Sequence, residues 1–405
     1  MDHIVELKRF HEVREALVND ALTRSIDYER FERGNITEGN LTHLHGEEHR
    51  DRRRIENVYF RKESLIWLDK EVIPEAIENS LQYVENGEQD LISIGRLVAT
   101  NVAARIVGLD FEQLSLDERH ELVEMIEDLG IGAAIDTVPA ADIEKVNHSA
   151  NSALGRFVEK YLRPLEPAGG GSNTFHPDSV TERRLLGALY GHVGQFGLDH
   201  ETVHREIVMH FLAATHTSSQ TLVNTIHELF AWVDENPEHS YQIGDLEFTR
   251  RCVHEALRLT PTNPKLLRRA VSDTVVAGRE VKAGTILHLN TYDANRDLAV
   301  FGADASSFDP NRNLDQGIPR YGMSFGGGMH QCMGRIVAVG TPIALGSGVA
   351  ERLDIVGLVP RMASAVIGRG VRRAEENSPR RETSTGRWTR WEIYPVRLEG
   401  VSESA

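Results

Sequence analysis

One segment near the C-terminus holds the residues best suited to chemistry. It reads Phe325-Gly326-Gly327-Gly328-Met329-His330-Gln331-Cys332-Met333-Gly334. Three consecutive glycines permit unusual backbone angles and the close approach of a flat ligand. Cys332 precedes a run typical of a helix start, where backbone N–H groups and the helix dipole stabilise a thiolate. A thiolate held in this way is a suitable axial ligand for haem iron.

Two other interpretations of this loop remain open from its residues alone. Cys332 is an inert side chain beside a glycine-rich turn in the first, since a free cysteine commonly behaves as a small buried hydrophobe. In the second, His330 activates Cys332 as a nucleophile. The spacing of two residues between them is only a weak signal for that chemistry.

Composition narrows the class of protein that carries this loop. The chain has 405 residues, of which 40% are hydrophobic, so a sizeable core is possible. Acidic residues outnumber basic ones by 61 to 45, and a net charge of -16 disfavours nucleic acid as a partner. The two cysteines, Cys252 and Cys332, cannot build a disulfide framework and indicate a reducing compartment. Residues Met1–Phe10 lack the apolar core of a signal peptide, and no stretch reaches the ~20 apolar residues of a membrane span, so we expect a soluble, cytoplasmic protein.

Apolar spacing predicts the elements that position the loop. The region from about residue 49 to residue 260 shows helical periodicity. It includes one long helix predicted over Asp199–Trp232, with Asp199 as its cap. Residues of about 1–20 and 261–331 are β-rich or irregular, with short strands at Thr274–Ala277 and Thr285–Leu289. A C-terminal helix and strands follow over 335–398. The fold class is therefore mainly α with a smaller β-rich portion (α+β), in one domain over 1–405.

Several motifs together resemble the cytochrome P450 superfamily in its soluble, bacterial form. The loop residues that match its haem-binding signature are Phe325, Gly326, Gly328, His330, Cys332 and Gly334. Glu255 to Arg258 matches the E-x-x-R helix of the family, and His49 to Arg53 matches an H-x-x-x-R helix. The strand beginning at Arg268 and the segment Phe308–Pro310 also resemble the family, in the same order and spacing. The match covers nearly the whole chain and implies the cytochrome P450 fold.

The resemblance implies haem b (iron protoporphyrin IX) as cofactor and Cys332 as the metal ligand. The haem-ligand loop is 325–334, and Phe325, Gly326 and Ala214 are expected to line the haem. His49, Arg53, Arg268 and His330 become expected donors to the two haem carboxylates. Taken alone, His49 and Arg53 would belong to a solvated helix face.

Glu255 and Arg258 have two interpretations as well. Taken alone, a pair at i, i+3 is a common surface pair on a helix. In the family, the same pair is buried and braces the haem loop. We therefore expect Glu255 and Arg258 to be needed for folding and not for chemistry.

The middle of the long helix resembles the oxygen-side segment of the family, which commonly reads A-G-x-[DE]-T-T. Ala213 and Ala214 fill the first two positions, Thr217 keeps the alcohol, and His216 replaces the acid. We expect Thr217 to orient a water molecule or the bound peroxide, with His216 relaying protons because imidazole titrates near neutral pH. The alternative for His216 is a structural histidine with its hydrogen bonds satisfied.

The expected activity is a haem-thiolate monooxygenase that inserts one oxygen atom from O2 into a C–H bond of a lipophilic small molecule, such as a terpenoid or related natural product. By resemblance, the substrate pocket involves Ala213, Pro264 and Leu267 together with the segments Arg30–Leu44, Thr262–Leu267 and Ser384–Arg387. Lys265 is more often solvent-facing than bound to a substrate carboxylate, since lysine is mostly exposed.

Electrons are expected from a ferredoxin and a ferredoxin reductase, because the sequence has no flavin or nicotinamide motif. A basic surface for the ferredoxin is predicted from Arg50, Arg52, Arg54 and Arg335, although a solvated face is the plain alternative. Two other activities remain open: an atypical oxidation, rearrangement, coupling or peroxide-driven reaction, suggested by His216, and a non-catalytic haem sensor or carrier.

Overall fold

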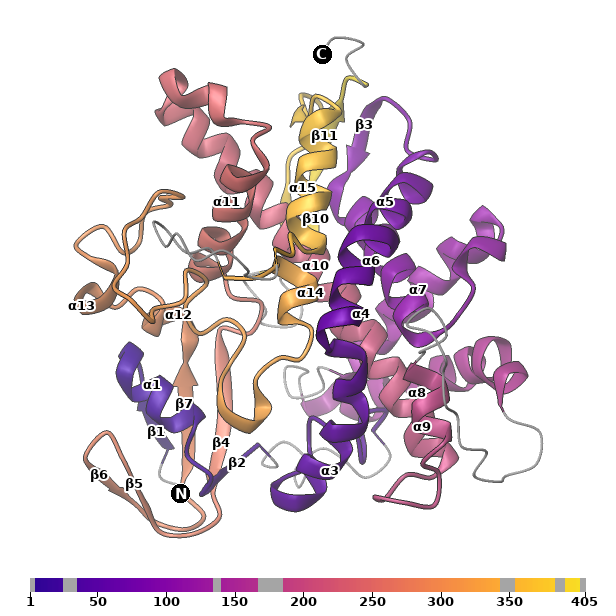
Figure 1. The fold of residues 1–405 in the computed structure, drawn as a ribbon, viewed down its shortest axis with the longest axis vertical. Coiled ribbons are helices and arrows are strands. Elements are labelled where there is room, and N and C mark those ends of the chain that lie inside the picture. Colours follow the sequence, from indigo (N-terminus) through magenta and orange to yellow (C-terminus); the bar gives the residue numbers. More distant parts are fainter. Residues whose placement is uncertain are drawn as a thin grey trace.

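A long helix, α10 (His200–Glu235), runs through the middle of the structure (Figure 1). Asp199 caps it by accepting a hydrogen bond of 2.7 Å from the backbone N–H of Thr202, as the sequence predicts. The computed structural model describes residues 4–24, 35–133, 140–166, 185–342, 354–382 and 390–400.

Most other helices belong to the same helical part of the molecule as α10 (Figure 1). In chain order they are α3 (Gly46–Glu56), α4 (Lys62–Trp67), α5 (Ile73–Leu81), α6 (Leu91–Val107), α7 (Leu116–Ala133), α8 (Ile143–Phe157), α9 (Leu185–Tyr190), α11 (Leu246–Leu259), α14 (Arg335–Val339) and α15 (Leu358–Gly368). α6 crosses α10 at small residues: a Cβ added at Gly95 would come within 3.0 Å of Ser219. This close crossing fixes the rotation of α10 about its own axis.

α10 belongs to two different apolar clusters along its length. Its first half packs with α7, α8 and α9 through Val203, Ile207 and Phe211. Its second half packs with α5, α11 and α15 through residues such as Leu222 and Ile226. Residues 213–217 lie between the two clusters, and Ala213 is exposed there although it is in the middle of a central helix. The structure therefore opens beside the middle of α10.

A four-stranded sheet lies beside the helical part, at the lower left in Figure 1. Its order is β1-β7-β4-β2, with β1 and β7 parallel and the other neighbours antiparallel. The strands are β1 (Ile4–Leu7), β2 (Leu22–Thr23), β4 (Lys265–Ala270) and β7 (Ile286–Asn290), and the short helices α1 (Phe10–Leu17), α12 (Thr291–Ala294) and α13 (Leu298–Phe301) lie near them. A third cluster of apolar residues holds α1 against this sheet. The predicted β-rich segments before residue 20 and after residue 261 thus form one sheet.

Two short strands make a hairpin at the edge of this region. β5 (Thr274–Val276) and β6 (Arg279–Val281) pair around Ala277 and Gly278, whose φ angles are +51° and +73°. Two positive φ values at the centre of a two-residue loop match the twist of a hairpin. The strands predicted from apolar runs at 274–277 and 285–289 are confirmed to within one residue.

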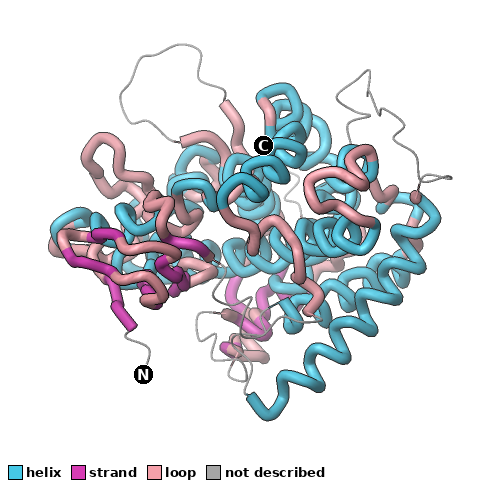
Figure 2. The backbone as a smooth tube through the Cα atoms, turned by 90° about the horizontal axis from the view of Figure 1, so that it is seen from below, coloured by secondary structure: helices cyan, strands magenta, loops and turns pink. Residues whose placement is uncertain are grey.

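The last two strands of the chain do not pair with each other. β10 (Trp391–Ile393) pairs with β9 (Arg380–Arg381), whereas β11 (Pro395–Leu398) lies between β3 (Gly87–Asp90) and β8 (Arg372–Arg373). β3 falls inside the segment predicted to be helical. Its four residues have no apolar alternation, so only the distant partner β11 makes this stretch a strand. Figure 2 shows these strands as small groups beside the helices.

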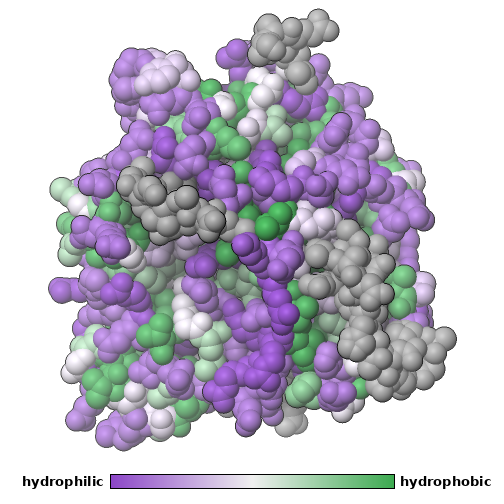
Figure 3. Space-filling model, in the orientation of Figure 1, coloured by the Kyte–Doolittle hydropathy of each residue, from purple (hydrophilic) through white to green (hydrophobic). Residues whose placement is uncertain are grey.

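Hydrophilic residues dominate the face drawn in Figure 3, with hydrophobic residues scattered among them. Within the described ranges, no helix combines the length and apolar character needed to cross a membrane.

Candidate functional site

Cys332 lies at the end of a tight loop that leads into α14. Its backbone N–H donates to the carbonyl of Phe325 over 3.0 Å, and the amides of Gly334 and Arg335 donate to its sulfur. Burial raises the pKa of the Cys332 thiol, while the two amides and the charge of Arg53 act in the opposite direction. The side chain still has an exposed side. This donor set fits a sulfur that a metal cation holds as a thiolate.

Two of the glycines before Cys332 are required by the backbone angle or by the space available. Gly326 and Gly328 have φ angles of +63° and +62°, which other residues rarely adopt. A Cβ at Gly328 would lie 2.3 Å from the carbonyl oxygen of Leu17. Gly328 therefore makes room for the end of α1. The expected approach of a flat ligand to the loop stays a prediction.

α3 holds the cysteine loop from one side. The Arg53 guanidinium donates through Nη1 to the carbonyl of Met329 at 2.7 Å and through Nη2 to the carbonyl of Gln331 at 2.5 Å. Both contacts lie within three residues of Cys332. Arg53 thus braces the loop in this structure, and its predicted contact with a haem carboxylate stays a prediction.

A cluster of basic side chains surrounds His330. The rings of His49 and His330 lie 4.5 Å apart, and the ring of His45 lies 6.4 Å from His330. Burial, followed by the neighbouring His49, Arg268 and Arg24, lowers the pKa of His330 to about 2. Burial also lowers the pKa of His49 to about 4.

These imidazoles have unused hydrogen-bonding atoms. Within the described residues, His45 Nδ1, His49 Nδ1 and His330 Nε2 are buried and have no hydrogen-bond partner. Buried polar atoms are normally paired, and clustered bases favour an anion. The cluster therefore fits a ligand with carboxylates, as haem b has, beside the sulfur of Cys332.

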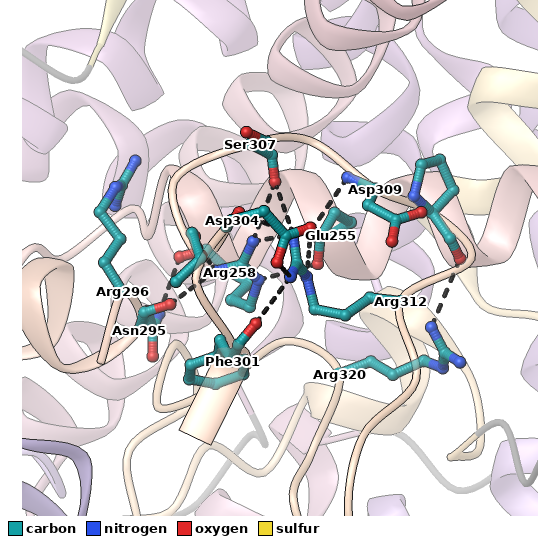
Figure 4. Close-up of polar contacts among 12 residues, drawn as sticks. Glu255, Arg258, Asn295, Arg296, Phe301, Asp304, Ser307, Asp309, Arg312 and Arg320 are labelled. Carbon is teal, nitrogen blue, oxygen red and sulfur yellow. Dashed lines mark hydrogen bonds and ion pairs between the residues drawn. The ribbon is translucent and has the colours of Figure 1, made fainter. Parts of the chain in front are cut away.

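The Glu255–Arg258 pair on α11 is internal (Figure 4). Arg258 is 0% exposed and donates to both carboxylate oxygens of Glu255, at 2.6 and 2.8 Å. Arg312 donates to the same carboxylate at 3.1 Å. The surface-pair interpretation is thus excluded for these residues. Arg312 was missed by sequence reasoning, although it lies only two residues after Phe308–Pro310.

Asn295 links this network to the cysteine loop. The backbone carbonyl oxygen of Asn295 accepts from the Arg258 guanidinium at 2.6 Å. The side-chain amide of Asn295 donates to the backbone carbonyl of Arg258 at 3.0 Å. Its Oδ1 also accepts from the backbone N–H of Met323 at 2.7 Å. The buried charges on α11 are therefore connected by hydrogen bonds to the start of the loop that carries Cys332.

The hydroxyl groups in the middle of α10 bond to the helix itself. Thr217 Oγ1 donates to the carbonyl of Ala213 at 2.5 Å, and Ser219 Oγ donates to that of Thr215 at 2.8 Å. Thr215 faces α6, where its hydroxyl lies 3.1 Å from that of Thr100. Thr217 is only half-buried and lies on the open side with Ala213 and Ala214.

His216 points toward α7. Its Nε2 lies 3.1 Å from the carbonyl oxygen of Ile126, so Nε2 carries a proton. A Cβ at Gly130 would lie 2.2 Å from the same nitrogen, which explains a glycine there. This geometry favours the structural interpretation of His216, and the proton relay through it stays a prediction.

A small cavity of about 60 Å³ adjoins Thr217; its lining residues are polar in type but present mostly apolar surface to it. Its lining residues are His216, Thr217, Gln220, Asn224, Thr260, Thr262, Asn263 and Arg390. Gln220 exchanges two hydrogen bonds of 2.8 Å with the backbone of Trp391, and Asn224 Oδ1 accepts from the Trp391 indole at 2.9 Å. The polar groups of the wall are thereby held in fixed orientations.

The residues predicted to line the substrate pocket differ in how buried they are. Pro264 and Leu267 are half-buried in the segment that supplies Thr262 and Asn263 to the cavity. Lys265 is exposed, and its Nζ lies 4.0 Å from Glu6, so it faces solvent and an acid of the same chain. The segments 30–34 and Ser384–Arg387 lie outside the described residues.

The structure shows that the predicted place of Arg52 on the docking surface is wrong. Arg52 is 1% exposed and donates to Glu206 over 2.6 Å, so it does not belong to a docking surface. Its partner comes from α10, far along the chain. Arg50 and Arg54 are exposed on α3, and Arg335 is half-buried.

Comparisons with known proteins agree with this arrangement. The family model described as Cytochrome P450 matches residues 3–339. The chain is 28% identical over 346 residues to pulcherriminic acid synthase of Bacillus subtilis (strain 168), covering 82% of this chain and 78% of that protein. It is 23% identical over 335 residues to cyclooctat-9-en-7-ol 5-monooxygenase of Streptomyces melanosporofaciens, covering 76% and 70%. A crystal structure of CYP109E1 from Bacillus megaterium in complex with testosterone has a TM-score of 0.71 at 18% identity, covering 97% of this chain and 91% of that one.

Proposed function

Because the chain belongs to the cytochrome P450 family, and is thus a haem b monooxygenase, we propose that it inserts one oxygen atom of O2 into a C–H bond of a small organic molecule. The observation that carries this proposal is the site around Cys332. The loop holds a sulfur with amide donors, and its His330 lies against His45 and His49, so that three buried imidazoles with unpaired ring nitrogens gather beside the sulfur.

The residues that would hold the haem follow from that site. Cys332 would supply the thiolate ligand, and His49, His330 and Arg268 would donate to the carboxylates. Haem with a thiolate ligand supplies the activation of dioxygen. The amides of Gly334 and Arg335 keep the sulfur charge in place, and Arg53 keeps the loop from shifting.

Thr217 is proposed to place a water molecule on the open side of α10. Its hydroxyl hydrogen is directed to the carbonyl of Ala213, so its lone pairs are available to accept from water. A water held at this hydroxyl can pass on a proton. Ala213 and Ala214 leave room for that water because their side chains are small.

The residues that line the cavity beside Thr217 refine the substrate expected from the sequence. We propose a lipophilic molecule, such as a terpenoid or related natural product, that also carries a neutral hydrogen-bonding group. Thr262, Asn263 and the amide of Asn224 offer hydrogen bonds, and Arg390 lies 3.6 Å from Glu382, so its charge is offset. A hydrogen-bonding group on the substrate would meet Thr262 or Asn263, while its carbon skeleton would lie against the apolar part of the wall.

A ferredoxin, itself reduced by a ferredoxin reductase, is proposed as the electron donor. The exposed Arg50 and Arg54, with Arg335 nearby in sequence to Cys332, offer positive charge on an otherwise acidic chain. An acidic partner would be attracted to such a surface. The atypical reactions considered from the sequence remain the second candidate, because no acid precedes Thr217.

Turnover with isotopically labelled dioxygen tests the proposal. A ligand is first chosen by its ability to change the spin state of the haem iron, and product is then collected with ferredoxin, reductase and nicotinamide cofactor. We expect one labelled oxygen atom in the product and the other in water. Product without label would reject oxygen insertion in favour of rearrangement, coupling or another atypical oxidation.

A further inference from the structure

A carboxylate and an imidazole form a buried pair between α3 and α10. Glu56 is 0% exposed, and its Oε2 lies 3.0 Å from His210 Nε2. Within the described residues, Glu56 Oε1 is buried and has no hydrogen-bond partner. The His210 side chain is 17% exposed, and its ring stacks on Phe60 with 6.3 Å between the ring centroids. One end of the pair is therefore dry, and the other has access to solvent.

A second buried carboxylate on α10, Glu206, lies near Glu56. Glu206 accepts from Arg52 at 2.6 Å and from the backbone N–H of Leu41 at 2.7 Å. Burial and the nearby charge of Glu56 raise the pKa of Glu206. Arg52 meets Glu206, and the charge of Arg53, on the same helix as Glu56, also reaches the Glu56 carboxylate. An imidazole that is hydrogen-bonded to a carboxylate is suited to take up a proton and pass it on.

The position of His210 on α10 places it on the same face of the helix as Ala213 and Thr217. Residues 206, 210, 213 and 217 follow each other at intervals of four, three and four, so they share one face of the helix. Along this face His210 and Thr217 are half-buried and Ala213 is exposed. Seven residues of helix span about 10 Å. A short chain of about three water molecules covers that length.

The nitrogen facing away from Glu56 is also available. His210 Nδ1 makes no hydrogen bond within the described part of the chain, whereas Nε2 of His216 is engaged by the carbonyl of Ile126. An imidazole can release a proton from one nitrogen while the other nitrogen stays bound to a carboxylate. His210 has the free nitrogen that this requires.

We propose that the Glu56–His210 pair is the proton donor for the oxygen side of α10, in place of the acid that the sequence lacks before Thr217. The inference rests on the proposed function. Oxygen insertion converts R–H, O2, two electrons and two protons to R–OH and water. The redox partner supplies the electrons. His210 releases each proton from Nδ1 to water along Ala213 and Thr217, and solvent returns it to the ring.

The same helix offers a matched control pair. His204 Nε2 lies 2.9 Å from Glu166 Oε1 and 3.1 Å from the hydroxyl of Tyr190, near α9 and away from the face that carries Thr217. The variants Glu56→Gln and His210→Gln remove the proposed donor. Glu166→Gln and His204→Gln make the same chemical changes in the control pair.

Two measurements on the haem-loaded protein decide the proposal. The first is the fraction of electrons that ends in free hydrogen peroxide, which we expect to rise at least about fivefold in Glu56→Gln and in His210→Gln because proton delivery slows. The second does not require turnover. The reduction potential of the haem should depend less on pH in these two variants than in the parent protein, because a nearby proton is no longer coupled to the electron. The control variants should keep both properties.

The result that would overturn the proposal is clear. Parent-like coupling and an unchanged pH dependence in His210→Gln would assign the pair a purely structural role, and an equal effect of His204→Gln would do the same. If Glu56→Gln does not take up haem, His210→Gln decides alone. Failure of the proposed function would instead appear in the parent protein, as product without labelled oxygen.

Discussion

At the scale of single residues, Thr217 has the simplest role to test. Thr217 lies on the open face of α10 and lines the cavity of about 60 Å³. Thr217→Ala should increase the peroxide formed per electron by about tenfold. This is less than the ~10²- to 10⁴-fold by which a positioned proton-transfer group typically raises a reaction rate. Binding of substrate should change little, because the removed hydroxyl acts on water.

Thr221→Ala is the matched control for this change. Thr221 lies one turn further along α10, is 4% exposed, and donates to the carbonyl of Thr217 at 2.7 Å. Peroxide release should stay at the parent level in this variant. Equal peroxide release from both variants, or unchanged coupling in Thr217→Ala, would contradict the role of the Thr217 hydroxyl.

Single residues also show where sequence reasoning reaches its limit. Cys332, Glu255 and Arg258 belong to short local motifs whose roles are predicted by the family resemblance, whereas the spacing of each motif alone leaves other interpretations open. Arg52 lies in a basic run that is typical of a solvated face, yet it is buried because Glu206, 154 residues away, meets its charge. No local sequence pattern predicts an ion-pair partner that lies so far along the chain.

At the scale of elements, the network on α11 determines whether the cysteine loop is held. Glu255→Gln keeps the side-chain shape but leaves Arg258 without its carboxylate and Arg312 with Asp304 alone. Removing one partner from a buried ion pair costs about 3–5 kcal/mol in the free energy of unfolding. We expect a loss of this size in urea denaturation, together with weaker haem retention.

An exposed acid on the same helix provides the comparison. The Glu247 side chain is 44% exposed and pairs with Arg250 at 2.8 Å. Glu247→Gln should cost at most about 1 kcal/mol, because solvent screens surface pairs. A loss for Glu255→Gln no greater than that for Glu247→Gln would show that the buried network does not stabilise the fold.

Elements differ in how well the sequence predicts them. α10 has a capping Asp199 and a sustained apolar period, so its start was predicted to the residue and its end to within three. β3 was missed because Gly87–Asp90 has no strand pattern of its own and pairs with a strand some 300 residues later. The pairing of β11 with β3 and β8 was not predictable for the same reason.

At the scale of the whole molecule, an acidic chain presents a few exposed arginines on the α3 side. Replacing Arg50 and Arg54 with Gln should raise the dissociation constant for a ferredoxin by about 3- to 10-fold at low salt. The difference should shrink at high salt, because ions screen exposed charges. Titration of the partner at two ionic strengths measures both effects.

Two arginines on the C-terminal strands serve as the control for net charge. Arg372 and Arg380 are exposed and pair with Glu399 and Glu392. Replacing both with Gln removes the same charge from another part of the surface. If this double variant weakens ferredoxin binding as much as the first, the α3 surface is not the docking site.

The spectrum of the reduced, carbon monoxide-bound protein tests the central claim most directly, since it reports the ligand of the iron. With Cys332 as a thiolate ligand, the parent protein should show the absorption band typical of haem-thiolate proteins. Cys332→His should move it to the position typical of imidazole ligation. Cys252→Ser, which changes a cysteine that is 0% exposed in α11, should leave it in place. A thiolate-type band that survives in Cys332→His, or an imidazole-type band in the parent protein, would contradict the account.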